Sequence, residues 1–426
     1  MVYKTYKCNS YNIHTIKTDR FKTVHMEIIF RKNIVKEELV NYAFLVDMLM
    51  ESSKNYPKRK DVITKLEELY KLVVYGTTIK TGNVLSSNFM ADFIDPKFID
   101  EDGYLENVIK FIFEMLMNPN ATNEEFDLKE FNFVKERLKR EIKSIDDNPF
   151  KSSMRKAIEA MDAMSVTAYP LMGSVEELEG ITPGSLYKYY KKLFKDNTCD
   201  IFIIGDVDCD NIVSLIQKYF KHRYINSNKL VLRVDNKFKK KITTKEDVSE
   251  NLQANLVMIY NTSELPEMER HVTMQVFNYI FGSGGLTSKL YKKIREENSL
   301  CYNISTLYLK YDELIAIHIS LDTTNVKKAI SLVKKCLKEM QTGEFLESDL
   351  EDAKKSISLA LDLTSDNNSS LLNNYVFHEF DNLPLIDERK KSLAKLTKED
   401  VVNVSRKLKL NTIYVLKGKE NIEWKK

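Results

Sequence analysis

The chain has 426 residues, enough for two or three domains with cores of their own. Its 43% hydrophobic and 30% charged residues are ordinary for a globular protein, and the formal net charge is only +3. Because basic and acidic residues alternate along the whole sequence, the composition argues against a dedicated nucleic-acid surface, and we expect no nucleic-acid partner.

Two further features bear on location. No hydrophobic run approaches the roughly 20 residues that span a membrane, and the N-terminal residues show no signal-peptide pattern, so we expect no membrane partner. The cysteines are widely spaced and form no C-x-x-C pair, which is typical of reduced thiols. We therefore predict a cytoplasmic location.

The pattern of apolar residues predicts both strands and long helices. Strands are predicted over 11–18, 22–30 and 251–262, where β-branched and aromatic residues gather. Helices are predicted, from apolar residues at helical spacing, over 37–52, 101–117, 123–145, 326–340 and 348–363. This mixture, in the same order twice, favours an α+β fold of two sandwich-like halves with helices against sheets.

A weak internal repeat supports the duplication. A helix predicted from Thr182 leads through an Asn-Thr turn into a strand over 199–205, and a helix from Thr397 leads through the same dipeptide into a strand over 413–418. Both threonines are placed as N-caps, where a hydroxyl accepts a hydrogen bond from a free N–H of the first turn. We predict an N-terminal half over 1–225, a charged linker over 226–250 and a C-terminal half over 251–426.

The second half contains a small-residue loop, a short helix and a strand over 282–302. Gly282, Gly284 and Gly285 would let backbone approach closely. Arg295 offers a planar fork of donors and Tyr302 a phenolic donor, which together suit a substrate clamp. Taken alone, the spacing of this pair favours a helix-end surface charge and a strand aromatic, because the chain has 22 tyrosines.

Metal-binding and nucleophile motifs are absent from the sequence. The six histidines include no pair at i, i+4 spacing and none between His25 and His222. The segment from His378 to Asn382 is the nearest miss to H-E-x-x-H; we interpret His378 as a solvated or capping residue, and His25 and His318 as strand residues. No G-x-S-x-G and no phosphate-binding loop occurs.

The segment 282–305 resembles the C-terminal half of the pitrilysin/insulinase-type (inverzincin) zinc peptidases, the family that includes the mitochondrial processing peptidase. The resemblance is carried by Gly-Leu-Thr-Ser-Lys-Leu-Tyr-x-x-Ile-Arg-Glu and Leu-Cys-Tyr-Asn-Ile-Ser, and Gln253 also matches a frequent family residue. It implies two homologous α/β-sandwich halves, with mostly antiparallel sheets flanked by helices, that form a clamshell. It also implies substrate-binding roles for the glycine-rich loop and for the Arg/Tyr pair. These residues are Arg295, Tyr302, Gly282, Gly284 and Gly285.

The zinc motif of this family, H-x-x-E-H, falls here on Ala43, Val46 and Asp47, so all three functional positions are degenerate. Glu141 matches the distal carboxylate ligand but is isolated. The resemblance therefore implies no catalytic residue, no metal and no cofactor in this chain alone, and it implies zinc in a partner subunit.

A retained substrate clamp without a metal site resembles the non-catalytic bacterial subunit of a heterodimeric zinc peptidase. Its partner would be a homologous subunit with the zinc motif, and its substrate a peptide or protein to be processed. The alternative is a pseudo-peptidase that acts only as a peptide-binding or scaffold protein in a maturation or modification pathway. A standalone peptidase with an unrecognised site is a third reading, which zinc content would test.

Overall fold

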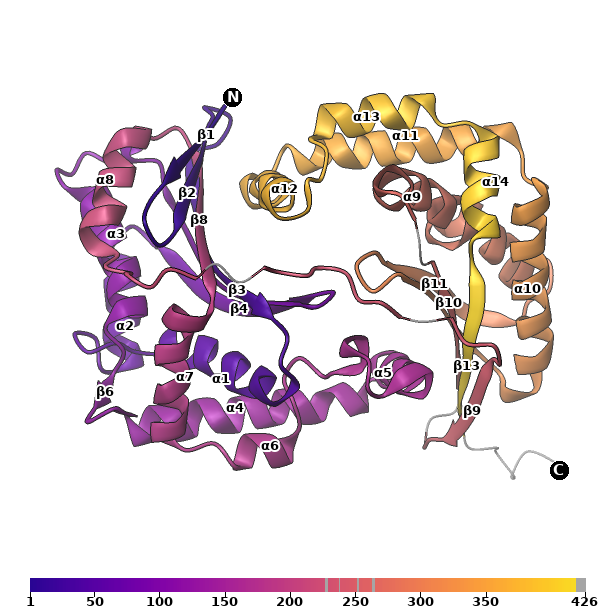
Figure 1. Cartoon of the computed structure of the whole chain (residues 1–426), viewed down its shortest axis with the longest axis horizontal. Coiled ribbons are helices and arrows are strands. Elements are labelled where there is room, and N and C mark those ends of the chain that lie inside the picture. The colour runs from indigo at the N-terminus through magenta and orange to yellow at the C-terminus, as the bar shows by residue number, and fades with distance from the viewer. Residues whose placement is uncertain (227–228, 237, 251–252, 263–264, 419–426) are drawn as a thin grey trace. The chain divides into compact units, whose positions relative to one another are not determined.

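The computed structural model describes residues 1–226, 229–236, 238–250, 253–262 and 265–418 of the chain. The chain divides into two compact units, each assembled from three stretches of sequence (Figure 1). Unit 1 contains Met1–Lys143, Pro170–Leu232 and Thr364–Asn382, and unit 2 contains Ser144–Tyr169, Arg233–Leu363 and Leu383–Lys426. Among the helices within the described ranges, none combines the length and the hydrophobicity needed to cross a lipid bilayer.

Unit 1 is built on a six-stranded sheet in the order β1-β2-β8-β3-β5-β4. Its strands are β1 (Val2–Lys7), β2 (Asn12–Lys17), β3 (Thr23–Asn33), β4 (Val73–Thr81), β5 (Val84–Ile94) and β8 (Thr198–Gly205). The β2–β8 pair is parallel, and the other described pairs of this sheet are antiparallel. β8 lies in the interior and is buried on both faces, which explains its nearly continuous apolar sequence.

Helices cover both faces of this sheet. The helices of unit 1 are α1 (Leu39–Leu49), α2 (Arg59–Glu68), α3 (Tyr104–Met117), α4 (Leu128–Asp147), α6 (Val175–Glu179), α7 (Pro183–Asp196), α8 (Cys209–Tyr219) and α12 (Asn368–Asp381), and α4 runs on into the first residues of unit 2. Successive residues of β3 show the two faces: Phe30 packs edge-on against Phe194 of α7, whereas Arg31 lies against Phe380 of α12. α1 is buried on nearly every side, so its apolar face is broad.

Unit 2 is built on a five-stranded sheet in the order β11-β12-β10-β13-β9. Its strands are β9 (Thr243–Val248), β10 (Ala254–Asn261), β11 (Cys301–Leu309), β12 (Leu314–Leu321) and β13 (Lys409–Lys417). Its α-helices are α5 (Pro149–Asp162), α9 (Met274–Asn278), α10 (Val326–Thr342), α11 (Glu347–Thr364), α13 (Ile386–Lys395) and α14 (Lys398–Arg406). Short π-helical turns η4 (Glu269–Thr273), η5 (Tyr279–Ser283) and η7 (Tyr291–Glu296) flank α9 and precede β11.

The two sheets share one topology. β8 lies between a parallel neighbour, β2, and an antiparallel neighbour, β3, and β13 lies in the same way between β9 and β10. From there each sheet continues through two antiparallel strands, β5 and β4 in unit 1 and β12 and β11 in unit 2. The strands of the predicted repeat are β8 and β13, which occupy matching positions in the two sheets. Thr182 and Thr397 both act as N-caps, as predicted, and the structure adds that each belongs to a capping box.

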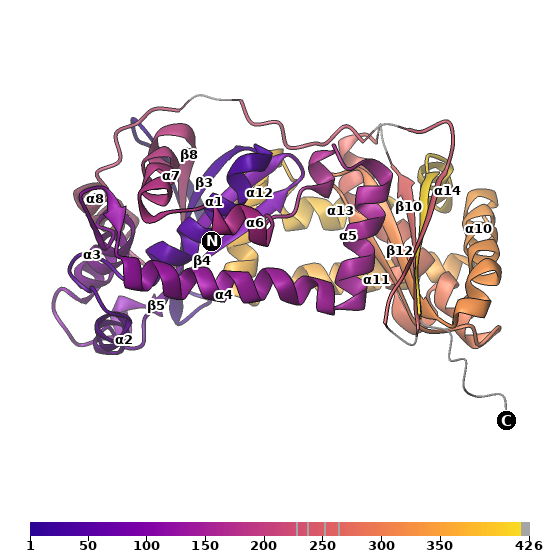
Figure 2. The same ribbon diagram turned by 90° about the horizontal axis from the view of Figure 1, so that it is seen from below.

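Each half of the sequence contributes one helix to the other unit. α5 packs against β10 and β13 of unit 2 (Figure 2), where Met154 and Met161 join a core with Val257 and Tyr414. α12, from the second half, packs against β3 and β8 of unit 1. The compact units therefore differ from the predicted division at 144–169 and at 364–382.

The predicted elements are observed with shifted ends. The strands predicted over 11–18 and 22–30 are β2 and β3, and the strand over 251–262 is β10, whose first two predicted residues lie outside the described ones. The five predicted helices are α1, α3, α4, α10 and α11. α4 begins at Leu128 rather than near Asn123, because Asn123 and Glu124 adopt positive φ in a tight turn between the two-residue strands β6 (Ala121–Thr122) and β7 (Glu125–Phe126).

The segment over 226–250 is not only a charged linker. It contains β9, which extends the sheet of unit 2 by pairing in parallel with β13. β9 lies at the edge of the sheet and reads Thr-Thr-Lys-Glu-Asp-Val, so it has no apolar alternation that would reveal a strand. Charged residues are usual on edge strands because they discourage pairing with other chains.

Candidate functional site

The positions of the degenerate zinc motif lie on α1. Ala43 and Val46 are buried in the core of unit 1. Val46 Cγ1 packs so closely on Gly76 of β4 that a Cβ at residue 76 would lie 2.5 Å from it. Both residues are therefore packing residues, and neither has a donor atom for a metal.

The third position, Asp47, belongs to an ion-pair cluster between α1 and α4. The guanidinium of Arg137 lies 3.4 Å from the Asp47 carboxylate and 3.0 Å from that of Glu51, which also pairs with Arg59 at 2.8 Å. Burial raises the pKa of Asp47, Glu141 and Glu51 add to this, and Arg137 acts in the opposite direction. The cluster therefore places a permanent cation between carboxylates.

This donor set does not fit zinc. A catalytic zinc site takes imidazole and carboxylate ligands and keeps one position open, whereas here the guanidinium of Arg137 already neutralises the carboxylates. Across the described ranges, no cluster of three or more His, Cys, Asp and Glu residues could hold a metal ion. Glu141 lies near Asp47, as the pKa of Asp47 indicates, but α1 offers no imidazole beside it. No metal-dependent step follows from these residues.

The glycine-rich segment packs against β11, and each of its three positions favours glycine for a steric or a conformational reason. A Cβ on Gly282 would overlap Cγ2 of Thr306 on β11, and a Cβ on Gly284 would lie 2.7 Å from the carbonyl oxygen of Tyr279. Gly285 has a φ of +62°, in the left-handed region, and its Cβ position meets nothing within 4 Å. The glycines are thus needed to build the segment, and their contact with substrate stays a prediction.

Arg295 and Tyr302 lie at the two ends of the turn that enters β11. Arg295, at the end of η7, is exposed and its guanidinium carbon lies 5.0 Å from the ring centroid of Tyr291. Tyr302 is 60% exposed and sits where the register of β11 against β12 shifts between Cys301 and Asn303. Such a β-bulge bends the strand and redirects a side chain. The bulge therefore explains how an aromatic residue near the start of a strand faces solvent.

The structure brings Arg295 close to the start of β11. Burial raises the pKa of the Cys301 thiol, and the charge of Arg295 acts in the opposite direction, which requires proximity. Among the described residues, Arg295 forms no ion pair, and no hydrogen bond joins its side chain to that of Tyr302. Both side chains are thus available to a ligand at the sheet edge.

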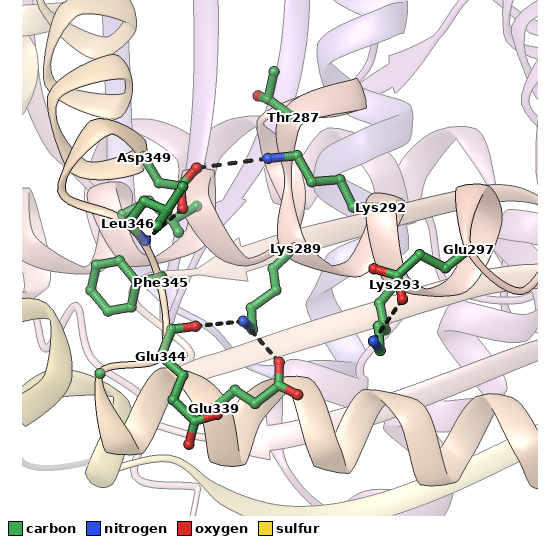
Figure 3. Close-up of a pocket in the computed structure, with 12 residues that line it drawn as sticks. Thr287, Lys289, Lys292, Lys293, Glu297, Glu339, Glu344, Phe345, Leu346 and Asp349 are labelled. Carbon is green, nitrogen blue, oxygen red and sulfur yellow. Dashed lines mark hydrogen bonds and ion pairs between the residues drawn. The ribbon is translucent and has the colours of Figure 1, made fainter.

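A charged cavity of about 430 Å³ lies beside the segment that carries Arg295 (Figure 3). Figure 3 shows three lysines of this segment, each directed toward an acidic side chain. The ion pairs are Lys289–Glu339 at 2.8 Å, Lys292–Asp349 at 3.7 Å and Lys293–Glu297 at 2.6 Å. Glu339 belongs to α10 and Asp349 to α11, so the first two pairs anchor the segment, whereas the third lies within it. Arg295 forms none of these ion pairs.

Sequence reasoning missed the Arg137 cluster and the bulge at Tyr302. Arg137 lies one helical turn before Glu141, so the i, i+4 spacing was a signal that both residues face α1. The bulge leaves no such signal, since it depends on the register of β12. Of the histidines, His25 and His318 lie in β3 and β12 as predicted, and His378 lies on α12.

Comparison with protein-family models matches residues 180–357 to the domain described as "Peptidase M16 inactive domain". A curated relative, the "Probable inactive metalloprotease YmfF" of Bacillus subtilis strain 168, is 26% identical over 413 residues. The alignment covers 96% of this chain and 96% of that relative. Both matches point to the family that the segment 282–305 resembles.

Solved structures share the fold. A conserved protein from Enterococcus faecalis V583 aligns with a TM-score of 0.93 at 23% identity, over 98% of this chain and 99% of that one. A structure described as the peptidase M16 inactive domain from Pseudomonas fluorescens aligns with a TM-score of 0.78 at 14% identity, over 99% of each chain. The chain is therefore similar to the M16 peptidases in sequence, through the inactive-domain match over residues 180–357, and it shares their fold over nearly its whole length. It has no histidine at the positions of their zinc motif.

Proposed function

We propose that this chain is the non-catalytic, substrate-binding subunit of a heterodimeric zinc peptidase that processes peptides or proteins. A homologous partner with the H-x-x-E-H motif holds the zinc, and Arg295 and Tyr302 of this chain complete the partner's active site. The observation that carries this proposal is the contrast between two sites. The metal positions on α1 are filled by core packing and a guanidinium, whereas Arg295 and Tyr302 remain exposed and unpaired within the described structure.

The chemistry of the pair suits an extended peptide. Arg295 can neutralise a carboxylate or a developing negative charge, and the phenol of Tyr302 can donate to a carbonyl oxygen. β11 is an edge strand, so its outer backbone groups can pair with an added strand. The lysine ion pairs around the neighbouring cavity hold the Arg295 segment in place, which lowers the entropy cost of binding.

The setting of the chain is part of the proposal. The described cysteines are all free thiols, which supports a reducing, cytoplasmic location. The near balance of charge supports a peptide rather than a nucleic acid as the ligand. Neither a nucleic acid nor a membrane is among the partners that we propose.

Reconstitution with the zinc-bearing homologue tests the proposal. The two chains should co-purify, and Arg295→Ala should abolish peptide hydrolysis by the complex without dissociating it. Lys328→Ala is the matched control, because Lys328 is an exposed cation on α10 of the same unit and its loss changes the charge equally. Equal activity of the Arg295→Ala and Lys328→Ala complexes would refute the role of Arg295.

A scaffold function is the second candidate, and the lost metal site favours it equally. In that case the complex forms and binds peptide, but hydrolysis by the partner does not depend on Arg295. Tyr302→Phe separates the two functions further, since it removes only the hydroxyl. Under the subunit proposal it lowers kcat of the complex, whereas under the scaffold function it leaves kcat unchanged.

A further inference from the structure

The face of the unit 2 sheet that α5 covers changes from apolar to polar along the strands. Near the middle of β10 and β12 this face is apolar and forms a core with α5. Toward the start of β10 and the end of β12 the same face carries polar side chains. These residues are Gln253, Asn255, Asn303, His318 and Ser320. They stand beyond the end of the core, where α5 begins.

An open cavity of about 500 Å³ lies over this polar patch. Asn148, Pro149 and Phe150, at the start of α5, form its remaining wall. No carboxylate, ammonium or guanidinium group is among its lining residues in the described structure. The cavity is therefore uncharged, and polar side chains share its lining with an apolar surface, which excludes a ligand whose affinity depends on an ion pair.

One wall of the cavity contains a buried acceptor without a partner. The amide oxygen of Asn255 accepts hydrogen bonds from Ser320 Oγ at 3.1 Å and from His318 Nε2 at 2.9 Å. The hydrogen of the imidazole is then on Nε2, so Nδ1 is an acceptor, and among the described residues it has no donor. Burial lowers the pKa of His318 to about 4, so the ring is neutral at pH 7.

Two further polar groups of the cavity are free to meet a ligand, whereas Asn148 caps α5 and Ser320 bonds to Asn255. The side-chain amides of Gln253 and Asn303 form no hydrogen bond with any other described residue. The ring of Phe150 lies edge-on over the imidazole of His318, with centroids 4.6 Å apart, and is 41% exposed. Because Nδ1 is itself buried, a ligand reaches it only if a neighbouring side chain such as the partly exposed Phe150 turns aside.

The corresponding corner of unit 1 shows that the fold does not itself require such a cavity. By the shared topology, β3 and β5 are the counterparts of β10 and β12. There His25 is held on both nitrogens, by Asp92 at 2.8 Å and by Glu27 at 3.0 Å, and its imidazole is buried. The unit 2 corner instead keeps an unpaired acceptor and two free amides around an open space.

We propose that this cavity is a peptide subsite that binds uncharged polar residues, meaning Asn, Gln, Ser or Thr, together with their backbone amides. Asn303 follows Tyr302 on the edge strand, so a chain running along β11 passes the mouth of the cavity. The amides of Gln253 and Asn303 match the donor and acceptor pair of such a chain, and His318 Nδ1 accepts one of its N–H or O–H groups. The proposal deepens the proposed function by naming its substrate class, and it rests on that function only in calling the bound peptide a substrate.

Peptide binding by the full chain alone tests the subsite. The probes are fluorescein-labelled hexapeptides, Gly-Gly-Asn-Gln-Gly-Gly and variants with Leu-Leu or Glu-Glu at the centre, and binding is followed by fluorescence anisotropy. We expect the Asn-Gln peptide to bind about tenfold more tightly than the other two, and Asn303→Leu and Gln253→Leu each to weaken it about fivefold. Asn403→Leu, an exposed amide on α14 outside the cavity, is the control and leaves binding unchanged. Equal affinity for the three peptides, or equal binding by pocket and control variants, would overturn the proposal.

A second readout reports on His318 itself. In protein labelled with ¹⁵N-histidine, the Nδ1 resonance should shift when the Asn-Gln peptide is added and should stay in place when the Glu-Glu peptide is added. An unmoved resonance at saturating Asn-Gln peptide overturns the role of Nδ1. Both experiments omit the zinc-bearing partner. A failure of the subsite is therefore distinguishable from a failure of the subunit proposal, which appears only as missing hydrolysis in the complex.

Discussion

Substitution of Gly282 tests the packing of the glycine-rich segment on β11. In Gly282→Ala the new methyl group overlaps Cγ2 of Thr306 and lies 2.8 Å from its Oγ1 and 3.1 Å from its Cβ. The segment cannot simply retreat, because Lys289 and Lys292 hold it to α10 and α11. Overpacking of this kind costs about 1–3 kcal/mol, and we expect a loss near the upper end.

The neighbouring threonine supplies a rescue. Thr306 Oγ1 is buried, and no described residue bonds to it, so Thr306→Ala removes an unpaired hydroxyl together with the clashing methyl group. Alone, this change should be within about 1 kcal/mol of neutral, since lost packing offsets the relieved hydroxyl. The double variant should regain about 1–2 kcal/mol relative to the sum of the single changes.

Native-state hydrogen exchange of the β11 and η5 amides measures these differences within unit 2 and avoids a two-state assumption for the whole chain. Gly285→Ala is the control: it meets no atom within 4 Å, but its φ of +62° costs about 1–2 kcal/mol, and Thr306→Ala should not rescue it. Wild-type protection in Gly282→Ala, or no coupling with Thr306→Ala, would refute the close packing of the segment on β11.

Three further predictions concern unit 1 and the repeat. Arg137→Met leaves the carboxylate of Glu51, which is 1% exposed, with only one of its two cationic partners. We expect it to destabilise unit 1 by about 2–4 kcal/mol in denaturant titrations. An effect smaller than that of substituting an exposed arginine would contradict the importance of this ion-pair cluster. Burial opposes the charge of His25, but hydrogen bonds to its two carboxylate partners outweigh burial and raise its pKa to about 9. Protonated His25 therefore contributes about 3 kcal/mol to the free energy of unfolding below pH 6.5, and this contribution is lost between pH 6.5 and 9. The thermal stability of the wild type should fall over this pH range, whereas that of His25→Gln should not. Thr182→Ala and Thr397→Ala each remove an N-cap bond and should each cost about 1 kcal/mol by urea unfolding, whereas a Ser replacement at either position should cost little; a strongly unequal loss would show that the two caps are not equivalent.

Much of the fold followed from local signals. The helices capped by Thr182 and Thr397 have apolar periodicity, and the structure places the strands that follow them at matching positions in two sheets of one topology. The predicted Asn-Thr turn before the second strand is wrong, because Asn411 and Thr412 lie inside β13, which begins at Lys409. The loss of the H-x-x-E-H histidines is read directly from the sequence, whereas the expectation that this chain binds no zinc stays a prediction. The substrate roles of Arg295, Tyr302 and the glycines remain predictions.

The rest depends on tertiary contacts that periodicity does not encode. β9 has a polar edge sequence, and only its pairing with β13 makes it a strand. The exchange of α5 and α12 between the units is invisible because each helix has an ordinary apolar face. The exposure of Tyr302 depends on a bulge set by the register of β12, and the cluster of Arg137 with Asp47 depends on how α4 packs on α1.

The most direct test of the subunit proposal is peptide hydrolysis by three samples with their zinc content recorded: this chain alone, its zinc-motif homologue alone, and the two together. We predict no zinc and no activity for this chain, and hydrolysis by the mixture that exceeds that of the homologue alone at least about tenfold. Full activity of the homologue by itself, unchanged on addition of this chain, would contradict the claim that Arg295 and Tyr302 complete a partner's active site.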